Sequence, residues 1–357
     1  MSYLEVRNIS KNFGNFKALE DISFGVERGE LVALLGPSGS GKTTILRTIA
    51  GLESADEGVV IIDDKVVNNL PGSKRGIGFV FQNYALFRYM TVRDNIAFGL
   101  KVQKMPKKEI DMRVSELIDL VGLSGLDKRY PNELSGGQRQ RVAFARALAP
   151  EPSVLLLDEP FAAIDAKVRQ ELRQWLRAIV GKLNLTAIFV THDQDEALEV
   201  SDRIIVMDHG HIEQIGQPVD IYAKPASAFV ARFAGNSPAL SGYGQLRGFE
   251  QHRDYPQAII RPEFIEAFKP DNEKFAFLLD ASDEGVVSGI FFRGDHLDVQ
   301  IEVCGMQLTL FRSLERRSVQ VGDHMRVVVY RLFALGNDGS IIEMLNTALP
   351  HNPTLMD

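Results

Sequence analysis

The stretch GPSGSGKTT, residues 36 to 44, constrains the fold of this chain more than any other part of its sequence. It satisfies the pattern G-x-x-x-x-G-K-[ST], and it lies between the apolar run ELVALLG and the helical pattern KTTILRTIAG. That is the strand–loop–helix context which the pattern requires. The glycines let backbone N–H groups wrap around phosphates, and the helix N-terminus adds a potential that favours anions. The stretch therefore predicts a phosphate-binding loop made of Gly36, Pro37, Ser38, Gly39, Ser40, Gly41, Lys42, Thr43 and Thr44.

Two side chains of this loop have the chemistry that a nucleoside triphosphate needs. We expect the Lys42 ammonium to reach the β- and γ-phosphates and the Thr43 hydroxyl to ligate Mg²⁺. The alternative is a glycine-rich turn that binds nothing, and the strand and helix on either side of the loop argue against it. We predict ATP and Mg²⁺ as cofactors.

The surrounding pattern predicts an α/β domain. Apolar runs of strand length alternate with helical patterns to about residue 235, and ELVALLG, GIGFVFQ, SVLLLDEP and TAIFVTHD are such runs. Buried runs of this kind, separated by helices, are typical of a mostly parallel sheet with crossover helices. No strand pattern occurs over about 91–150, which predicts an inserted helical subdomain. We therefore expect a P-loop NTPase (RecA-like) core over residues 1–235.

The pattern changes after ARFAGNSPAL, and we place a domain boundary near Asn236. Beyond it apolar and polar residues alternate, as Leu297, Val299 and Ile301 do with their neighbours, and glycine-bearing turns separate the segments. Short segments of period two at this spacing predict a small all-β domain, OB-like, over residues 236–357.

Composition bounds the class of protein. The chain has 357 residues, 45% hydrophobic and 24% charged, which is typical of a globular protein with two domains. Its net charge of −7 disfavours nucleic acid as a partner, because such proteins carry a basic face. Cys304 is the only cysteine, so an intramolecular disulfide or a multi-cysteine zinc site is excluded. We expect no signal peptide at MSYLEVRNIS and no membrane-spanning helix.

A second motif, VLLLDEP, is an apolar strand that ends in adjacent carboxylates. We expect Asp158 to hold the metal ion through its water shell and Glu159 to polarise the attacking water as a general base. Acidic residues often end strands without a catalytic role, so the pair indicates catalysis only because the chain also has the glycine loop.

Two further side chains end apolar strands of the same kind. His192 follows the apolar strand in AIFVTHD, at a place where a sensor of the γ-phosphate would be useful. The alternative is a structural role, which is usual for a lone histidine at a strand end. Gln82 ends GIGFVFQ and is a neutral side chain able to contact both metal and water. We predict a catalytic set of Lys42, Gln82, Glu159 and His192, and a metal set of Thr43, Gln82 and Asp158.

In this order the motifs resemble the ATP-binding subunits of ABC transporters over residues 1 to about 235. The discriminating element is LSGGQ, residues 134–138, since most other P-loop ATPases lack it. The resemblance implies a head-to-tail homodimer, in which this segment faces the ATP held by the partner's glycine loop. It implies contacts to the nucleotide in trans from Ser135, Gly136, Gly137 and Gln138.

Two single residues carry over from the same family. Phe13 in KNFGNFKAL matches the aromatic residue that stacks on adenine, and an ordinary core phenylalanine is the alternative. Asp165 matches the aspartate of the loop that crosses the dimer interface. This chain departs from the family in having Ala162 and Ile164 where serine and leucine are usual.

The resemblance also implies a role in import. IIRPE and GDHMRVVVYRLF are similar to the β-rich regulatory domain appended to ATPases of many bacterial importers. YALFRYMTV and ELRQWLR are similar to the ATPases of sulfate/thiosulfate importers, whereas sugar and polyamine members more often have proline where Arg88 stands. In the family a helix of the membrane subunit docks just after Gln82, which predicts an apolar docking groove at Tyr84, Leu86, Phe87, Tyr89 and Met90.

The expected protein is thus an ATPase peripheral to the cytoplasmic face of the membrane, serving two transmembrane permease subunits and indirectly an extracytoplasmic solute-binding protein. Its alternatives are an importer ATPase for iron, phosphate, a sugar or a polyamine, and a soluble ABC ATPase without a transport role. A regulatory function of the C-terminal domain is compatible with any transport role.

Overall fold

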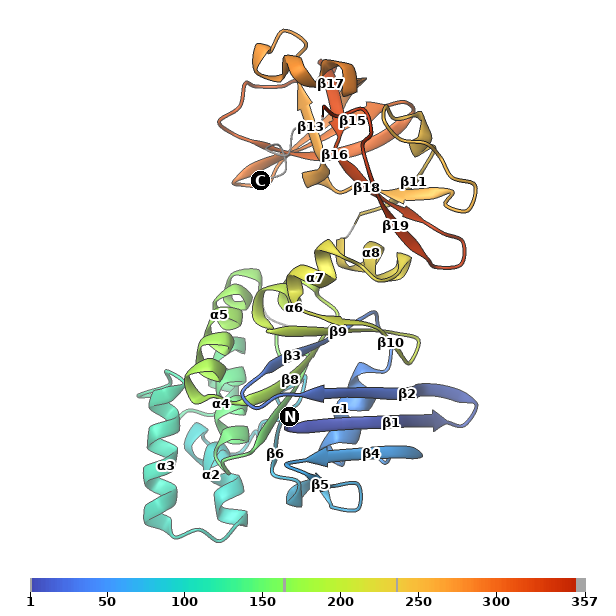
Figure 1. Cartoon of the computed structure of the whole chain (residues 1–357). Helices are drawn as coiled ribbons and strands as arrows, with labels where there is room; N and C mark the ends of the chain where they lie inside the picture. The colour runs from blue at the N-terminus through green and yellow to red at the C-terminus, as the bar shows by residue number, and fades with distance from the viewer. Residues whose placement is uncertain (1, 163–164, 236, 351–357) are drawn as a thin grey trace. The chain divides into compact units, whose positions relative to one another are not determined.

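A computed structural model describes residues 2–162, 165–235 and 237–350 of the chain (Figure 1). Its contacts divide the chain into one unit that ends at Ile221 and a second that begins at Tyr222. The predicted boundary residue, Asn236, and the unusual Ile164 both lie outside the described residues.

The first unit is built on a six-stranded sheet of order β10-β9-β3-β8-β7-β6. Its strands are β3 (Leu31–Leu35), β6 (Ile77–Val80), β7 (Val154–Asp158), β8 (Thr186–Thr191), β9 (Arg203–Asp208) and β10 (His211–Gly216). Five of the six are parallel and β10 alone is antiparallel. β3, β7 and β8 are wholly buried, which explains their unbroken apolar sequences. The predicted parallel sheet is confirmed.

A second, antiparallel sheet of order β2-β1-β4-β5 packs with this parallel sheet around one core. Its strands are β1 (Leu4–Phe13), β2 (Phe16–Val26), β4 (Glu57–Ile62) and β5 (Lys65–Val66). The expected alternation of strands and helices from the start of the chain is wrong here, because β1 and β2 form a hairpin with no helix between them. Its inner residues share one core with α1 (Lys42–Ala50) and the parallel sheet.

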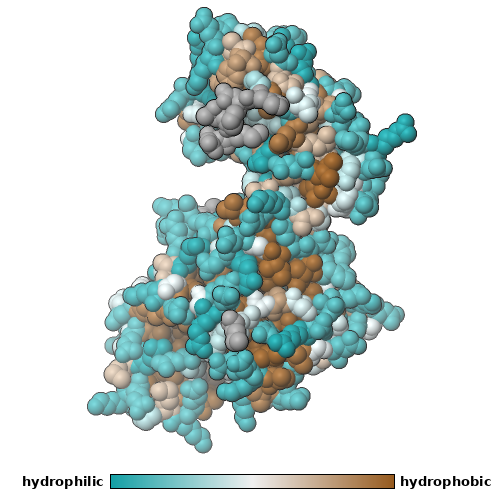
Figure 2. Space-filling view, in the orientation of Figure 1, coloured by the Kyte–Doolittle hydropathy of each residue, from teal (hydrophilic) through white to brown (hydrophobic). Residues whose placement is uncertain are grey.

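Residues 91–150 contain helices and no strand, as predicted. They form α2 (Val92–Val102), α3 (Lys107–Leu120) and α4 (Gly136–Leu148), with α2 packed on both of the others. The remaining helices of this unit are α5 (Ala166–Leu183) and α6 (Gln194–Val200), and α7 (Pro218–Ala223) runs from it into the second unit. In the part of the chain that is described, no helix is long and apolar enough to cross a bilayer. Figure 2 shows mostly hydrophilic side chains on the visible face of each unit.

In its described residues the second unit is all-β apart from the end of α7, α8 (Ala228–Gly235) and several 3₁₀ segments. One sheet has the order β11-β12-β18-β19 and the other β13-β17-β14-β15-β16, and both are antiparallel. The strands are β11 (Ala239–Ser241), β12 (Gln257–Ile259), β13 (Ile265–Phe268), β14 (Asp283–Phe292), β15 (His296–Val303), β16 (Met306–Ser313), β17 (His324–Val329), β18 (Arg331–Leu335) and β19 (Ile341–Leu345). Inner residues of both sheets form one core, consistent with the OB-like domain that the sequence predicts.

Helix α8 belongs to this β unit by its packing. Ala228 and Ala231 pack with Ile259, Phe264 and Phe333, residues of the β unit. Arg261 of the IIRPE segment is fully buried beside them, with its guanidinium 3.9 Å from the Tyr222 ring centroid and 5.0 Å from that of Phe333. The contacts thus divide the chain before α8, upstream of the boundary that the change in sequence pattern indicates.

Candidate active site

The glycine loop between β3 and α1 brings its backbone very close to neighbouring chain segments. A Cβ atom on Gly36 would lie 2.1 Å from the Met207 carbonyl oxygen, and one on Gly41 would lie 2.6 Å from that of Ala18. Gly41 also has φ of 97°, a conformation that residues with a side chain rarely adopt. The glycines are therefore required by the fold itself as well as by any phosphate that approaches the loop.

Lys42 directs its ammonium back into this loop. The Nζ atom donates to the carbonyl oxygens of Gly36 at 2.8 Å and Pro37 at 2.7 Å, and to the Ser40 hydroxyl at 3.3 Å. Burial lowers the pKa of Lys42, and the negative charges of Glu159 and Asp158 oppose that shift. A phosphate entering the loop thus meets a cation that the loop already orients.

Thr43 and Asp158 face each other across the beginning of α1 and the end of β7. The Thr43 hydroxyl donates to the Asp158 carboxylate at 3.1 Å, and Arg47 lies 3.8 Å from the other carboxylate oxygen. Burial raises the pKa of Asp158 despite these two contacts. A hydroxyl and a carboxylate oxygen beside a phosphate loop are the donor types that Mg²⁺ prefers, so these residues fit that ion.

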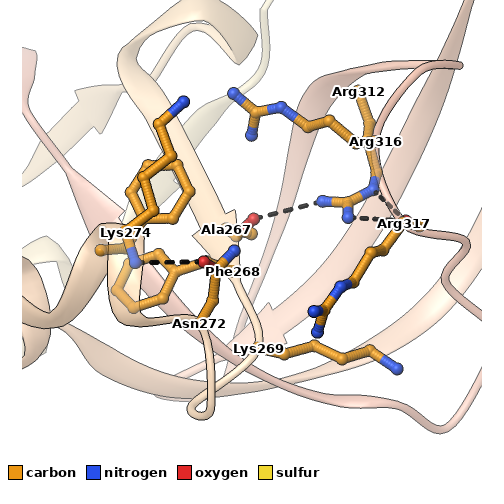
Figure 3. Close-up of a pocket in the computed structure, with 9 residues that line it drawn as sticks. Ala267, Phe268, Lys269, Asn272, Lys274, Arg312, Arg316 and Arg317 are labelled. Atoms are coloured by element: carbon orange, nitrogen blue, oxygen red, sulfur yellow. Dashed lines mark hydrogen bonds between the residues drawn. The ribbon is translucent and has the colours of Figure 1, made fainter.

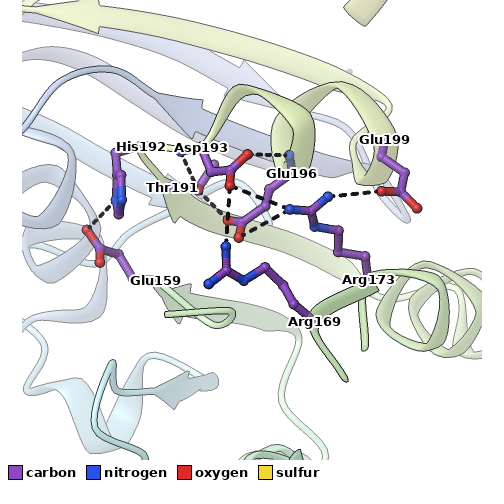
Figure 4. Close-up of polar contacts among 8 residues, drawn as sticks. All are labelled: Glu159, Arg169, Arg173, Thr191, His192, Asp193, Glu196 and Glu199. Atoms are coloured by element: carbon purple, nitrogen blue, oxygen red, sulfur yellow. Dashed lines mark hydrogen bonds and ion pairs between the residues drawn. The ribbon is translucent and has the colours of Figure 1, made fainter. Parts of the chain in front are cut away.

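Glu159 contacts two side chains that follow neighbouring strands, Gln82 after β6 and His192 after β8. The Glu159 backbone has φ of 45°, so the extended course of β7 ends at the preceding residue, Asp158. One carboxylate oxygen accepts from the Gln82 side-chain amide at 2.8 Å, and the other lies 3.4 Å from Nδ1 of His192 (Figure 4). The structure therefore brings together three of the four predicted catalytic residues. The fourth, Lys42, interacts with Glu159 through charge, because the carboxylate of Glu159 favours the ammonium form of Lys42.

An ionic cluster behind His192 was not foreseen from the sequence. Arg173 of α5 lies 3.5 Å from the Asp193 carboxylate, 3.7 Å from that of Glu196 and 3.2 Å from that of Glu199 (Figure 4). Asp193 also caps α6, accepting from the backbone N–H of Glu196. The residue that follows His192 is thus fixed to two helices. The acidic run HDQDE was the only signal for this cluster, because nothing in a linear sequence pairs it with α5.

The LSGGQ segment begins helix α4. Ser135 is its N-cap and accepts from the Gln138 N–H at 3.2 Å, while the Gln138 side chain accepts from the Ser135 N–H at 2.9 Å. This reciprocal pair is a capping box. A Cβ atom on Gly137 would lie 2.9 Å from a Val168 methyl group, so the glycine lets α4 approach α5. Asp165 in turn caps α5 through the Val168 N–H at 3.0 Å.

Phe13 at the end of β1 is 47% exposed, which is more than a core phenylalanine would be. The Lys11 ammonium lies 5.4 Å from its ring centroid and 3.2 Å from the Asp56 carboxylate. Asp56 also accepts from the Asn12 N–H at 2.7 Å. Phe13 is therefore a surface aromatic residue on an anchored strand end, where a flat ligand could stack.

A groove of about 1,050 Å³ lies directly beside Gln82, lined among others by Leu86, Tyr89 and Arg139. Tyr89 is 96% exposed. Tyr84 also lines the groove but is largely buried, whereas Phe87 is 38% exposed and lies on Phe98 with ring centroids 4.4 Å apart. The segment thus combines anchored and exposed aromatic side chains.

One buried amide fixes this segment to α2. Asn95 is fully buried, and its Oδ1 accepts from the Phe87 N–H at 2.9 Å. Its Nδ2 donates to the carbonyl oxygens of Phe87, Met90 and Thr91 at 3.2, 3.0 and 3.0 Å. No sequence pattern indicates this role for an asparagine in a helix.

Comparisons with known proteins agree with the motifs. The family model described as "ABC transporter" matches residues 19–162. The chain is similar to proteins named "Sulfate/thiosulfate import ATP-binding protein CysA" from several bacteria. It is 47% identical to that of Nocardia farcinica over 98% of this chain and 99% of the relative, and 58% identical to that of Acinetobacter baylyi over 77% of each.

Solved structures of similar proteins include a dimeric ATP-binding cassette in a post-hydrolysis state bound to ADP and Pi. It is 34% identical, with a TM-score of 0.54 over 60% of this chain and 98% of that one. A second is cbiO1 from Clostridium perfringens, part of the ABC transporter complex cbiONQ, 32% identical with a TM-score of 0.59 over 62% of this chain and 91% of that one.

Proposed function

Because this chain belongs to the ABC transporter family of ATP-binding proteins, we propose that it is the ATP-hydrolysing subunit of a sulfate/thiosulfate importer. The observation that carries the enzymatic part is the meeting of Gln82, Glu159 and His192 at the carboxyl ends of three adjacent strands, next to the glycine loop. Relatives whose names state sulfate/thiosulfate import support the solute, since one of them aligns over nearly the whole chain.

In this function the loop of residues 36–44 binds the phosphates of ATP, with Lys42 on the β- and γ-phosphates. Thr43, Gln82 and Asp158 hold Mg²⁺, Asp158 through water, and the ion supplies charge neutralisation at the phosphates. Glu159 takes a proton from the attacking water as general base. His192 contacts the γ-phosphate, and Phe13 stacks on adenine.

We infer further that each reaction centre is completed by a second copy of the chain. Helix α4 packs against α2, α3, α5 and β6, whereas α1 packs against β2, β7 and β8. Among the described residues, no hydrogen bond joins Ser135 to residues 36–44, since its hydroxyl and N–H bond with Gln138. Ser135, Gly136, Gly137 and Gln138 therefore contact the nucleotide of the partner copy, and Asp165 lies at the dimer interface. A similar ATP-binding cassette whose solved structure is dimeric supports this arrangement.

Mixing two inactive variants tests the shared site. Lys42→Ala removes the phosphate-binding cation, and Ser135→Arg blocks the contact made in trans. In a mixed head-to-tail dimer one of the two sites has both residues intact, so a random equal mixture recovers about a quarter of the wild-type sites. If the mixture hydrolyses ATP no faster than the two variants measured separately, each chain uses its own Ser135 and the dimer proposal is wrong.

The groove beside Gln82 is the proposed docking site for a permease helix. Each of the two copies of the chain would receive a helix from one of the two permease subunits. Exposed Tyr89 and partly buried Leu86 supply apolar contact, and Asn95 keeps the segment in place. Such docking places the protein at the cytoplasmic face of the membrane, where an extracytoplasmic solute-binding protein acts on it through the permease. Gln82 at the edge of the groove connects docking with the catalytic carboxylate.

The solute is tested in vesicles that contain the permease and a solute-binding protein. Sulfate or thiosulfate should raise ATP hydrolysis, whereas phosphate, iron or a sugar should not. Stimulation by one of the latter alone would assign the chain to another importer. The β unit, residues 222–357, serves as the regulatory domain in this scheme, and hydrolysis that is unchanged after its deletion in a folded protein would remove that role.

A further inference from the structure

A pocket of about 180 Å³ in the β unit is lined largely by cationic side chains (Figure 3). It lies at the end of β13 and at the turn between β16 and β17, beside the 3₁₀ segment Glu273–Ala281. The cations are Lys269, Lys274, Arg312, Arg316 and Arg317. Its volume is below the roughly 300–1,000 Å³ of sites for drug-sized ligands, so it suits a small ion.

The deepest cation, Arg312, is only 6% exposed. Its guanidinium donates to the carbonyl oxygen of Ala267 at 3.2 Å and to that of Arg317 at 2.8 Å (Figure 3). Among the described residues no carboxylate forms a direct ion pair with it. Burial and the neighbouring Arg316 lower its pKa, against the opposing charges of Glu266 and Asp323. A buried charge without a direct ion-pair partner is costly, which makes an anion at this place favourable.

The other four cations are only partly neutralised. Glu266 pairs with Arg316 through both carboxylate oxygens, Asp323 lies 3.3 Å from Lys269, and Asp271 lies 3.7 Å from Arg317. Within the part of the chain that is described, Lys274 has no carboxylate partner. Five cations thus face three carboxylates, an excess of two positive charges around a small cavity.

We propose that this pocket binds a small oxyanion with two negative charges, of the class of sulfate, thiosulfate or phosphate. The charge of such an ion matches the excess, and planar guanidinium groups donate paired hydrogen bonds to tetrahedral oxyanions. Asn272 adds a side-chain amide at the rim. The site lies in the β unit, and none of its residues takes part in the reaction centre of the other unit.

A purely structural role for these cations predicts different behaviour. Arg312 joins the backbone of β13 to that of the turn after β16, and this contact would stabilise the domain without any ligand. Lys274 and Arg317 are exposed and make no such backbone bridge, so they can be replaced with little effect on folding. If the cations had a purely structural role, replacing Lys274 and Arg317 would leave sulfate binding unchanged, whereas an anion site predicts that it weakens.

The experiment is calorimetric titration of the full-length protein with sodium sulfate at constant ionic strength. The double variant Lys274→Gln/Arg317→Gln removes two pocket cations, and Arg253→Gln, an exposed cation of the same unit outside the pocket, is the control. Lys42→Ala removes the other place where sulfate could bind, the glycine loop. Thermal unfolding without sulfate checks that each variant folds.

Sulfate should bind to the wild type, to Arg253→Gln and to Lys42→Ala. Its affinity should fall by roughly tenfold for each pocket cation removed. The proposal is overturned if Lys42→Ala abolishes all binding, or if the double variant binds sulfate as the wild type does. Thiosulfate, phosphate and chloride titrations rank the anions, and chloride that binds as tightly as sulfate contradicts a site for a dianion.

Vesicles of phosphatidylglycerol distinguish a free ion from a lipid headgroup. Binding to these vesicles that requires Lys274 and Arg317 and that free sulfate, thiosulfate or phosphate does not displace would assign the pocket to a membrane surface, against the proposal. Binding that these ions displace supports the shared oxyanion chemistry.

Discussion

Replacing Glu159 by glutamine separates catalysis from every other property of the site. The two side chains have nearly the same shape, and the new amide oxygen can still accept from the Gln82 amide that lies 2.8 Å from the native carboxylate. The change removes one negative charge and the ability to take a proton. It also removes a charge that favours the ammonium form of Lys42, but Asp158 continues to provide that effect.

The expected loss is confined to turnover. A positioned general base contributes about 10²–10⁴-fold, which corresponds to about 2.7–5.5 kcal/mol of activation free energy. ATP affinity should stay the same or increase, because one anionic charge disappears from the neighbourhood of the phosphates. Unfolding free energy should change by less than about 0.5 kcal/mol, as for other substitutions that leave no buried group unpaired. The variant should therefore accumulate as an ATP-bound dimer.

The assay is release of phosphate at saturating ATP and Mg²⁺, with light scattering to follow dimer formation and nucleotide binding measured in parallel. Glu199→Gln is the matched control, since it removes a carboxylate of the Arg173 cluster that lies on the protein surface. Turnover of Glu159→Gln within threefold of the wild type would refute the role of Glu159 as general base. A parallel loss of ATP affinity would instead indicate that its carboxylate supports the binding site.

Three further predictions concern stability. Asn95→Ala should lower the unfolding free energy in urea by about 2–4 kcal/mol, because it leaves buried backbone groups unpaired, whereas exposed Asn83→Ala should have almost no effect. Burial raises the pKa of Asp158, so the folded protein keeps the proton of this carboxyl group to higher pH than the unfolded chain does. The unfolding free energy therefore falls as the pH rises from 3.8 through the raised pKa. Because Asp158→Asn removes this cost, it should raise the Tm at pH 7. A Tm equal to or below that of the wild type would contradict this sign. Gly41→Ala should lower the Tm more than Gly39→Ala does. Both glycines have positive φ, but only a Cβ atom at position 41 would meet the backbone of another segment. Equal losses of Tm would show that backbone strain alone accounts for the effect.

Local patterns accounted for much of the ATPase unit. The glycine loop is readable because its strand, turn and helix are consecutive, and the motif residues Lys42 and Thr43 lie within it. The helical segment was predictable for the same reason, since its periodicity and the lack of alternating segments are local properties. The hairpin of β1 and β2 was not, because its strands bury their inner faces against α1 and the parallel sheet, and the pattern of apolar residues does not state the direction of pairing.

By itself the sequence determined which residues end strands and which turn adopts the phosphate-binding form, because propensity and φ preference act over a few neighbouring positions. Only the tertiary structure decided that β6, β7 and β8 lie side by side, so that Gln82, Glu159 and His192 meet although more than thirty residues separate each from the next. It also decided that Arg173 fixes the residue after His192, and that five cations surround one pocket. Contacts between distant segments depend on sheet order and packing, and these are properties of the folded chain as a whole.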